Sequence, residues 1–152
     1  MQATTAGIKS YLIVNLVLAG SIGLIFVYSG IFSAEKDNYP LPSFFEEITG
    51  EVPPSAGMSR AFSELVRGNF GAASAYNPDS PLIFAFFLIQ FIQRTAVTFL
   101  LLKEARTGSK PLVRMSHPTI KYLLPIDVIA SMILFIFCFR GQIQAMLELL
   151  LE

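Results

Sequence analysis

The sequence has little of what thiol, metal and nucleic-acid chemistry requires. Among 152 residues it holds one cysteine, Cys138, and one histidine, His117. A single thiol excludes an intramolecular disulfide and a multi-thiolate metal site. Charged residues make up 14% of the chain, against about 25% in a typical soluble domain. Because 11 basic residues balance 11 acids, the chain lacks the excess of positive charge that is typical of nucleic-acid-binding proteins.

Apolar residues take the place of these groups. They make up 53% of the chain, with 14 phenylalanines, no tryptophan and a mean hydropathy of +0.59. Small domains bury only about two-thirds of their chain surface, so a chain of this length cannot hide so much apolar surface in a soluble core. The composition predicts an all-α integral membrane protein in contact with the lipid bilayer.

Three segments are apolar enough to span a bilayer, which takes roughly 20 residues. They are Tyr11–Phe32, Pro81–Leu102 and Pro118–Phe139. The first is longer than the roughly 7–15 apolar residues of a cleaved signal peptide, so we expect an uncleaved anchor. The sequence predicts a single membrane domain, residues 1–152, with three transmembrane helices.

Residues 33–80, between the first two spans, are predicted to form an ordered segment with short helices. Its first half is rich in proline and acidic residues. Over residues 57–67, Met58, Phe62 and Leu65 share one helical face, a pattern typical of a helix lying on a membrane surface or against a partner. Further short helical or amphipathic elements are expected at Phe70–Tyr76 and over residues 141–152.

Basic residues predict the orientation, because lysine and arginine concentrate in short cytoplasmic loops. Residues 103–121 hold five basic residues and one acid, whereas residues 33–80 hold three basic residues and seven acids. We therefore expect the loop over residues 103–117 and the N-terminus to be cytoplasmic. The long segment and the C-terminus then lie outside.

Two charges near the middle of the predicted spans match in depth. A charge at mid-membrane costs about 2.5–3.5 kcal/mol on insertion scales and usually finds a partner. Arg94 and Asp127 both lie roughly 12–14 Å from the cytoplasmic edge at 1.5 Å per residue. Gln90 and Thr98 lie one turn to either side of Arg94, and Ser131 lies one turn from Asp127. The sequence predicts a charge pair inside the helix bundle.

This pair has two interpretations. It either fixes the register of the helices or forms part of a proton or ion relay. Relays usually offer several acids or histidines in series, and here one aspartate stands alone, which favours the structural role. On the first span, Asn15, Ala19 and Gly23 form a stripe of small residues with an amide. Such a stripe predicts a helix-packing face, for this chain or for a second copy.

No catalytic motif is present. The chain lacks GxSxG, GxxxxGK[ST] and HExxH, the signatures of hydrolases, P-loop proteins and metalloproteases. The sequence therefore predicts neither an enzyme nor a cofactor nor a metal site.

Residues 41–78 carry a spacing of motifs that resembles a known family. The family pattern is CP, then TG, then CP-x-CG-x-TRA, L-x-x-G and a final A-x-x-x-NP. The matching positions here are Pro42, Thr49, Gly50, Pro54, Gly57, Ser59, Arg60, Ala61, Leu65, Gly68, Ala73, Asn77 and Pro78. This segment resembles a family of small bacterial three-helix membrane proteins of unknown function.

The resemblance implies a three-span fold with a structured outer motif, in the bacterial cytoplasmic (inner) membrane. It implies no activity. The three cysteines of the family would fall at Leu41, Pro53 and Ala56, so a metal or thiol role in relatives does not carry over.

The leading hypothesis is a non-enzymatic membrane subunit or scaffold that docks partner proteins or copies of itself. Its partner-binding motif would be Gly57, Ser59, Arg60, Asn77 and Pro78. The alternative is an ion- or proton-conducting or sensing component with the charge pair at its centre. A polar path would then be lined by Gln90, Gln93 and Asn15. A membrane enzyme or redox protein comes third, because cysteine and histidine are so scarce.

Overall fold

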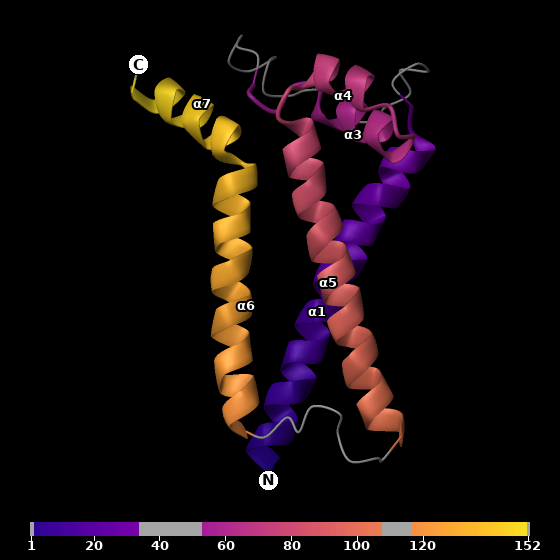
Figure 1. Ribbon diagram of the computed structural model, residues 1–152, viewed down its shortest axis with the longest axis vertical. Coiled ribbons are helices and arrows are strands. Elements are labelled where there is room, and N and C mark those ends of the chain that lie inside the picture. The colour runs from indigo at the N-terminus through magenta and orange to yellow at the C-terminus, as the bar shows by residue number, and fades with distance from the viewer. Residues whose placement is uncertain (1, 34–52, 108–116, 152) are drawn as a thin grey trace. The chain divides into compact units, whose positions relative to one another are not determined.

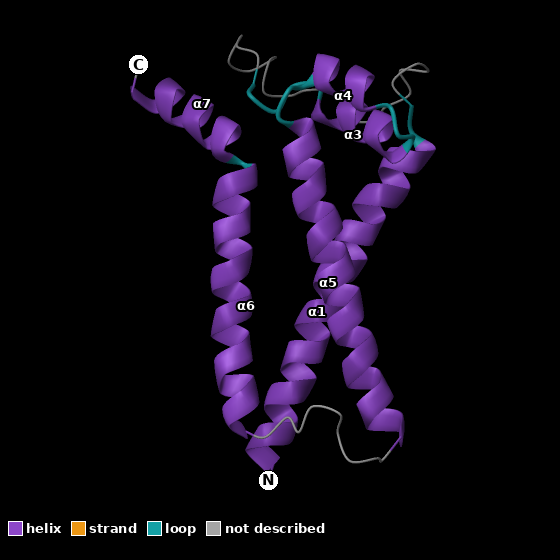
Figure 2. Cartoon of the chain, viewed as in Figure 1, coloured by secondary structure: helices purple, strands orange, loops and turns teal. Residues whose placement is uncertain are grey.

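The computed structural model describes residues 2–33, 53–107 and 117–151. Within these ranges the regular structure is entirely helical, as Figure 2 shows. The helices, labelled in Figure 1, are α1 (Gln2–Ile31), α3 (Met58–Val66), α4 (Phe70–Tyr76), α5 (Ser80–Thr107), α6 (His117–Cys138) and α7 (Arg140–Leu151). The prediction of an all-α protein is confirmed.

Two helices are long and apolar enough to cross a membrane. The candidate spans are Lys9–Ile31 in α1, with a mean hydropathy of 2.2, and Ser80–Lys103 in α5, with a mean hydropathy of 1.7. A third span exists if Pro125–Cys138 and Arg140–Glu148, which are bent by 64°, count as one broken span. Large apolar side chains along these helices face outward, as expected where lipid is the solvent. The chain is an integral membrane protein with two to three candidate spans.

Helices α1 and α5 extend beyond the apolar segments that were predicted as spans. α1 begins at Gln2, well before the predicted Tyr11, because hydropathy marks the part that lipid surrounds and not the whole helix. α6 ends at Cys138 and α7 begins at Arg140, so the predicted end of the third span at Phe139 coincides with the bend between these two helices. Backbone hydrogen bonds from Phe139 N to Phe135 O and from Ile143 N to Phe139 O, both 2.9 Å, run through this bend.

The chain divides into two compact units. Unit 1 comprises Met1–Gly23 and Leu88–Leu134, and unit 2 comprises Leu24–Phe87 and Phe135–Glu152. Unit 1 holds a polar network centred on Arg94. Unit 2 holds α3, α4 and α7.

In unit 2, α3 and α4 pack on each other as a helical hairpin. Ala61, Leu65 and Ala73 form its buried core, with Phe84 of α5 packed against them. Phe62 is also buried and meets Phe84 edge-on, with ring centroids 5.4 Å apart. The predicted helix over residues 57–67 is therefore present as α3, with two of its three expected apolar side chains, Phe62 and Leu65, fully turned inward.

Some predictions fall outside the described residues. These are the proline-rich, acidic stretch over residues 34–52, with Pro42, Thr49 and Gly50 of the family pattern, and residues 108–116 of the predicted cytoplasmic loop.

Candidate functional site

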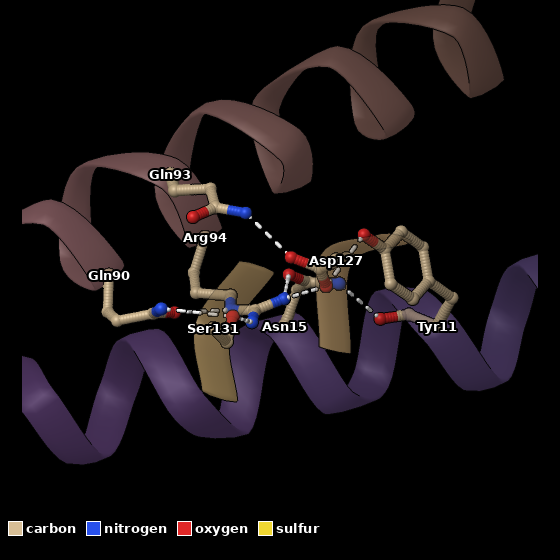
Figure 3. A network of polar contacts seen from close by, with 7 residues as sticks. All are labelled: Tyr11, Asn15, Gln90, Gln93, Arg94, Asp127 and Ser131. Carbon is tan, nitrogen blue, oxygen red and sulfur yellow. Dashed lines mark hydrogen bonds and ion pairs between the residues drawn. The ribbon is translucent and has the colours of Figure 1, made fainter. Parts of the chain in front are cut away.

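Arg94 lies at the centre of a polar network in unit 1 that joins α1, α5 and α6 (Figure 3). Its Nη1 forms an ion pair with Asp127 Oδ2 and donates to Asn15 Oδ1 at 3.2 Å. Its Nε donates to Gln90 Oε1 at 3.2 Å, and its Nη2 donates to Ser131 Oγ at 3.0 Å. The guanidinium thus contacts each of the three helices.

The carboxylate of Asp127 is equally well satisfied. Besides the guanidinium of Arg94, it accepts hydrogen bonds from Gln93 Nε2 at 2.6 Å and from Tyr11 Oη at 3.3 Å. The side chain of Asp127 is 10% exposed and that of Arg94 is 7% exposed. A buried charge is costly unless it is paired and hydrogen-bonded, and this pair meets both conditions.

Helical spacing brings these groups together. Tyr11 and Asn15 are one turn apart on α1, as are Gln90 and Arg94 on α5, and Asp127 and Ser131 on α6, so each pair shares a helix face. Asn15 is fully buried, and its Nδ2 donates to the carbonyl of Tyr11 at 2.8 Å, which aims its Oδ1 at the guanidinium of Arg94.

This arrangement can lock three helices in register. The sequence alone predicted Arg94, Asp127, Gln90 and Ser131 here, and the structure brings all four together. Gln93, which the sequence placed beside them on a polar path, also joins the network, whereas Tyr11 was missed. The position of Tyr11 one turn before Asn15 was the signal available for it.

Two further observations concern metal binding and unpaired polar groups. No group of three or more histidine, cysteine, aspartate or glutamate side chains that could hold a metal ion occurs among the described residues. One open feature remains on α5. Thr98 Oγ1 is buried and, within the described structure, has no hydrogen-bond partner, so the polar face of α5 continues one turn beyond Arg94.

The predicted helix-packing stripe on α1 lies against α5 of the same chain at two of its three positions. Asn15 bonds to Arg94, and a Cβ at Gly23 would lie 3.4 Å from Phe91 Cε2. Ala19, between them, is half-buried. The stripe thus serves packing within the chain.

Two residues of the predicted partner-binding motif close the α3–α4 hairpin. Gly57, at the start of α3, has φ +74°, and a Cβ there would lie 2.5 Å from the carbonyl oxygen of Tyr76. Asn77 Nδ2 donates to the carbonyls of Pro54 and Ala56 at 3.1 and 3.0 Å. These contacts tie the end of α4 to the turn before α3, which gives Gly57 and Asn77 a structural role.

The other three motif residues, Ser59, Arg60 and Pro78, are exposed. Ser59 and Arg60 lie in the first turn of α3 and also make contacts within the molecule. They are the part of the motif that a partner could reach.

Arg67 holds the hairpin to α1, a contact that the sequence did not reveal. Its Nη2 donates to the carbonyls of Gly30 and Phe32, each at 3.1 Å, and its Nη1 donates to Ser63 O at 2.6 Å. The last carbonyls of a helix lack partners within the helix, and a cation there also favours the helix dipole. Arg67 therefore caps the end of α1 from another helix.

The start of α7 is held to the hairpin as well. Gln142 Nε2 donates to Pro54 O at 2.9 Å and to Asp79 Oδ2 at 3.1 Å. The Asp79 carboxylate occupies the space that a Cβ of Gly141 would need. An acid at a helix N-terminus is favourable, so Asp79 stabilises the beginning of α7.

Comparison with known proteins gives one match. A family model described as "Protein of unknown function (DUF2752)" matches residues 43–91, which include the α3–α4 hairpin and the first part of α5 and end before Arg94. No curated protein and no solved structure matches the chain. Over residues 43–91, the chain is similar to this family of unknown function.

Proposed function

We propose that the protein is a non-enzymatic integral membrane subunit that docks a partner protein through the α3–α4 hairpin. One observation carries the proposal: the hairpin is anchored by Arg67, Asn77 and Gln142, yet it exposes large apolar side chains. Phe70 is 61% exposed and Tyr76 is 41% exposed. Exposed aromatic side chains on a rigid element are typical of protein interfaces.

The charge distribution supports an orientation for this subunit. With the basic loop over residues 103–117 in the cytoplasm, the hairpin and α7 lie on the outer side of a bacterial inner membrane. The partner is then a protein with an exposed surface on that side. Arg60, exposed in the first turn of α3, offers a planar donor fork that suits a carboxylate on such a surface.

Quantitative affinity purification of the tagged full-length chain in a mild detergent tests the proposal. Phe70→Ala is expected to release the partner while the variant stays folded and inserted. Phe99→Ala is the matched control, because Phe99 is 65% exposed on α5 within a candidate span. Equal retention of co-purifying proteins in wild type and Phe70→Ala would refute docking at this face.

Variants of Arg60 distinguish a role of this residue in partner recognition from a role in folding. Arg60→Lys keeps the charge but loses the fork, and Arg60→Ala loses both. Loss of the partner from a folded Arg60→Ala variant supports docking, and loss of the folded protein assigns Arg60 to the structure of the hairpin. Normal folding with full retention of the partner removes Arg60 from the interface.

A second candidate function is conduction or sensing of ions or protons through Arg94 and Asp127. The buried Thr98 hydroxyl favours it, because that group extends the polar face of α5 beyond the ion pair. Flux into liposomes that hold the purified protein tests it. A flux that Asp127→Asn abolishes supports conduction, and the absence of flux in the wild type contradicts it.

A further inference from the structure

Unit 2 contains an apolar cavity of about 610 Å³. This volume falls in the range of small-molecule sites, roughly 300–1,000 Å³. Its walls include the side chains of Leu24, Ile25, Phe62, Ile83, Phe87 and Phe139. The cavity is thus built from α1, α3 and α5 together with the bend between α6 and α7.

The cavity lies at the depth of hydrocarbon, next to the membrane surface. Leu24 and Ile25 lie within the last seven residues before Ile31, where α1 and its candidate span end. Ile83 and Phe87 lie within the first seven residues after Ser80, where the span in α5 begins. At 1.5 Å per residue these wall residues lie up to about 10 Å from the end of the spans.

The polar groups of the cavity are uncharged. Ser55 precedes α3 and Ser59 lies in its first turn, and both lie outside the candidate spans. Ser29 also lines the cavity, but its hydroxyl donates to the carbonyl of Ile25 at 2.8 Å within α1. The cavity therefore has apolar walls in the membrane and hydroxyl groups on the side of α3, with no charged residue in its lining.

We propose that this cavity binds one acyl chain of a membrane lipid, with the ester region of that lipid at Ser55 and Ser59. Leu24 lines the cavity and is also 70% exposed, so the cavity opens sideways onto the bilayer. Lipid is the solvent on that side. An acyl chain in the cavity gains affinity from van der Waals contact with the apolar walls, because burial from water contributes little where lipid is the solvent. Because no charged side chain lines the site, it selects the chain and not the charge of the headgroup.

Because the sequence contains no tryptophan, one introduced tryptophan reports lipid binding by its fluorescence from a known position. Phe139→Trp places a fluorophore in the cavity wall, and Phe99→Trp places one on α5 at an exposed position. Each purified variant is titrated in detergent micelles with phosphatidylglycerol or phosphatidylethanolamine brominated on the acyl chain. Fluorescence of Phe139→Trp should fall saturably at a low lipid mole fraction, with the same midpoint for both headgroups. Fluorescence of Phe99→Trp should fall only in proportion to the lipid added.

A blocking variant shows whether the chain occupies the cavity. Leu24→Phe in the Phe139→Trp background fills the mouth and should raise the quenching midpoint, because the bound chain loses packing contacts with the cavity walls. Leu16→Phe, at another exposed position on α1, should leave it unchanged. Met58→Trp, also in the lining, serves as reporter if Phe139→Trp does not fold.

Three results would overturn the proposal. Equal, unsaturable quenching of the cavity and surface reporters shows that no chain is bound. An unchanged midpoint in Leu24→Phe places the lipid elsewhere. A co-purifying protein that Leu24→Phe releases, without saturable quenching, makes the occupant a partner segment. Because the Phe70 and Arg60 variants test docking at another surface, failure of this proposal leaves the proposed function standing.

Discussion

The ion pair between Arg94 and Asp127 gives the sharpest prediction about stability. Asp127→Asn keeps the size of the side chain and one acceptor oxygen, and it removes the charge. The guanidinium of Arg94, whose side chain is 7% exposed, then keeps only its neutral partners Asn15, Gln90 and Ser131. The variant therefore leaves a buried cation without a counter-charge.

The size of the effect distinguishes charge from hydrogen bonding. Asp127 accepts from Arg94, Gln93 and Tyr11, and hydrogen bonds between transmembrane helices average about 0.6 kcal/mol. Loss of all three would cost only about 2 kcal/mol on that scale. Removing one partner of a buried ion pair costs roughly 3–5 kcal/mol. We expect Asp127→Asn to lower the free energy of unfolding by at least about 3 kcal/mol.

Reversible unfolding in mixed micelles with increasing dodecyl sulfate, followed by circular dichroism, measures this cost. Asp127→Asn, Arg94→Gln and the double variant complete a double-mutant cycle, and the double variant should be more stable than either single one. Ser131→Ala is the uncharged control, with an expected loss of about 1 kcal/mol. Single variants within about 0.5 kcal/mol of the wild type, or costs that simply add in the double variant, would refute the reasoning.

Three further predictions concern the hairpin and the topology. Arg67→Lys, which cannot bridge several carbonyls at once, should speed amide hydrogen exchange in the last turn of α1, and unchanged exchange would show that the cap contributes nothing. Gly57→Ala should lower the melting temperature more than Gly68→Ala, because both glycines have positive φ but only a Cβ at Gly57 would contact the carbonyl of Tyr76. Equal losses would show that backbone strain alone causes the effect. In a cysteine-free background, Ser55→Cys and Ser109→Cys should react with an impermeant maleimide from opposite sides of the membrane, and labelling from one side would overturn the orientation.

The ion pair could be predicted because a charge inside an apolar run is rare and its depth follows from counting residues. Tyr11 was missed because a tyrosine at the start of an apolar span is ordinary at a membrane interface and gives no sign of a partner inside the membrane. The role of Arg67 was not predicted either, although this residue lies in the helix predicted over residues 57–67. Its contact with the end of α1 depends on how α3 packs, and the local sequence does not record that packing.

The break between α6 and α7 could be predicted, because the third apolar span ends at Phe139 and an amphipathic element was expected over residues 141–152. Its angle of 64° could not be predicted, because the turn before Phe139 holds neither proline nor glycine and helical hydrogen bonds run through the bend. Ring stacking of Phe135 on Phe139, with centroids 4.4 Å apart, and the contact of Asp79 with Gly141 occur where the helix turns. The first is a local contact one helical turn apart and the second joins distant parts of the chain, and hydropathy detects neither.

The polar network also sets constraints on the biogenesis of the protein. A ribosome delivers its parts in order: the Asn15 amide on α1, then the Arg94 cation on α5, and finally the Asp127 anion on α6. Until α6 arrives, α5 carries an unpaired cation that costs about 2.5–3.5 kcal/mol in the bilayer. α5 therefore gains by staying beside the insertion machinery until α6 emerges, so the two helices should enter the bilayer together. A chain that stalls between them would present that lone arginine to the quality-control proteases of the membrane.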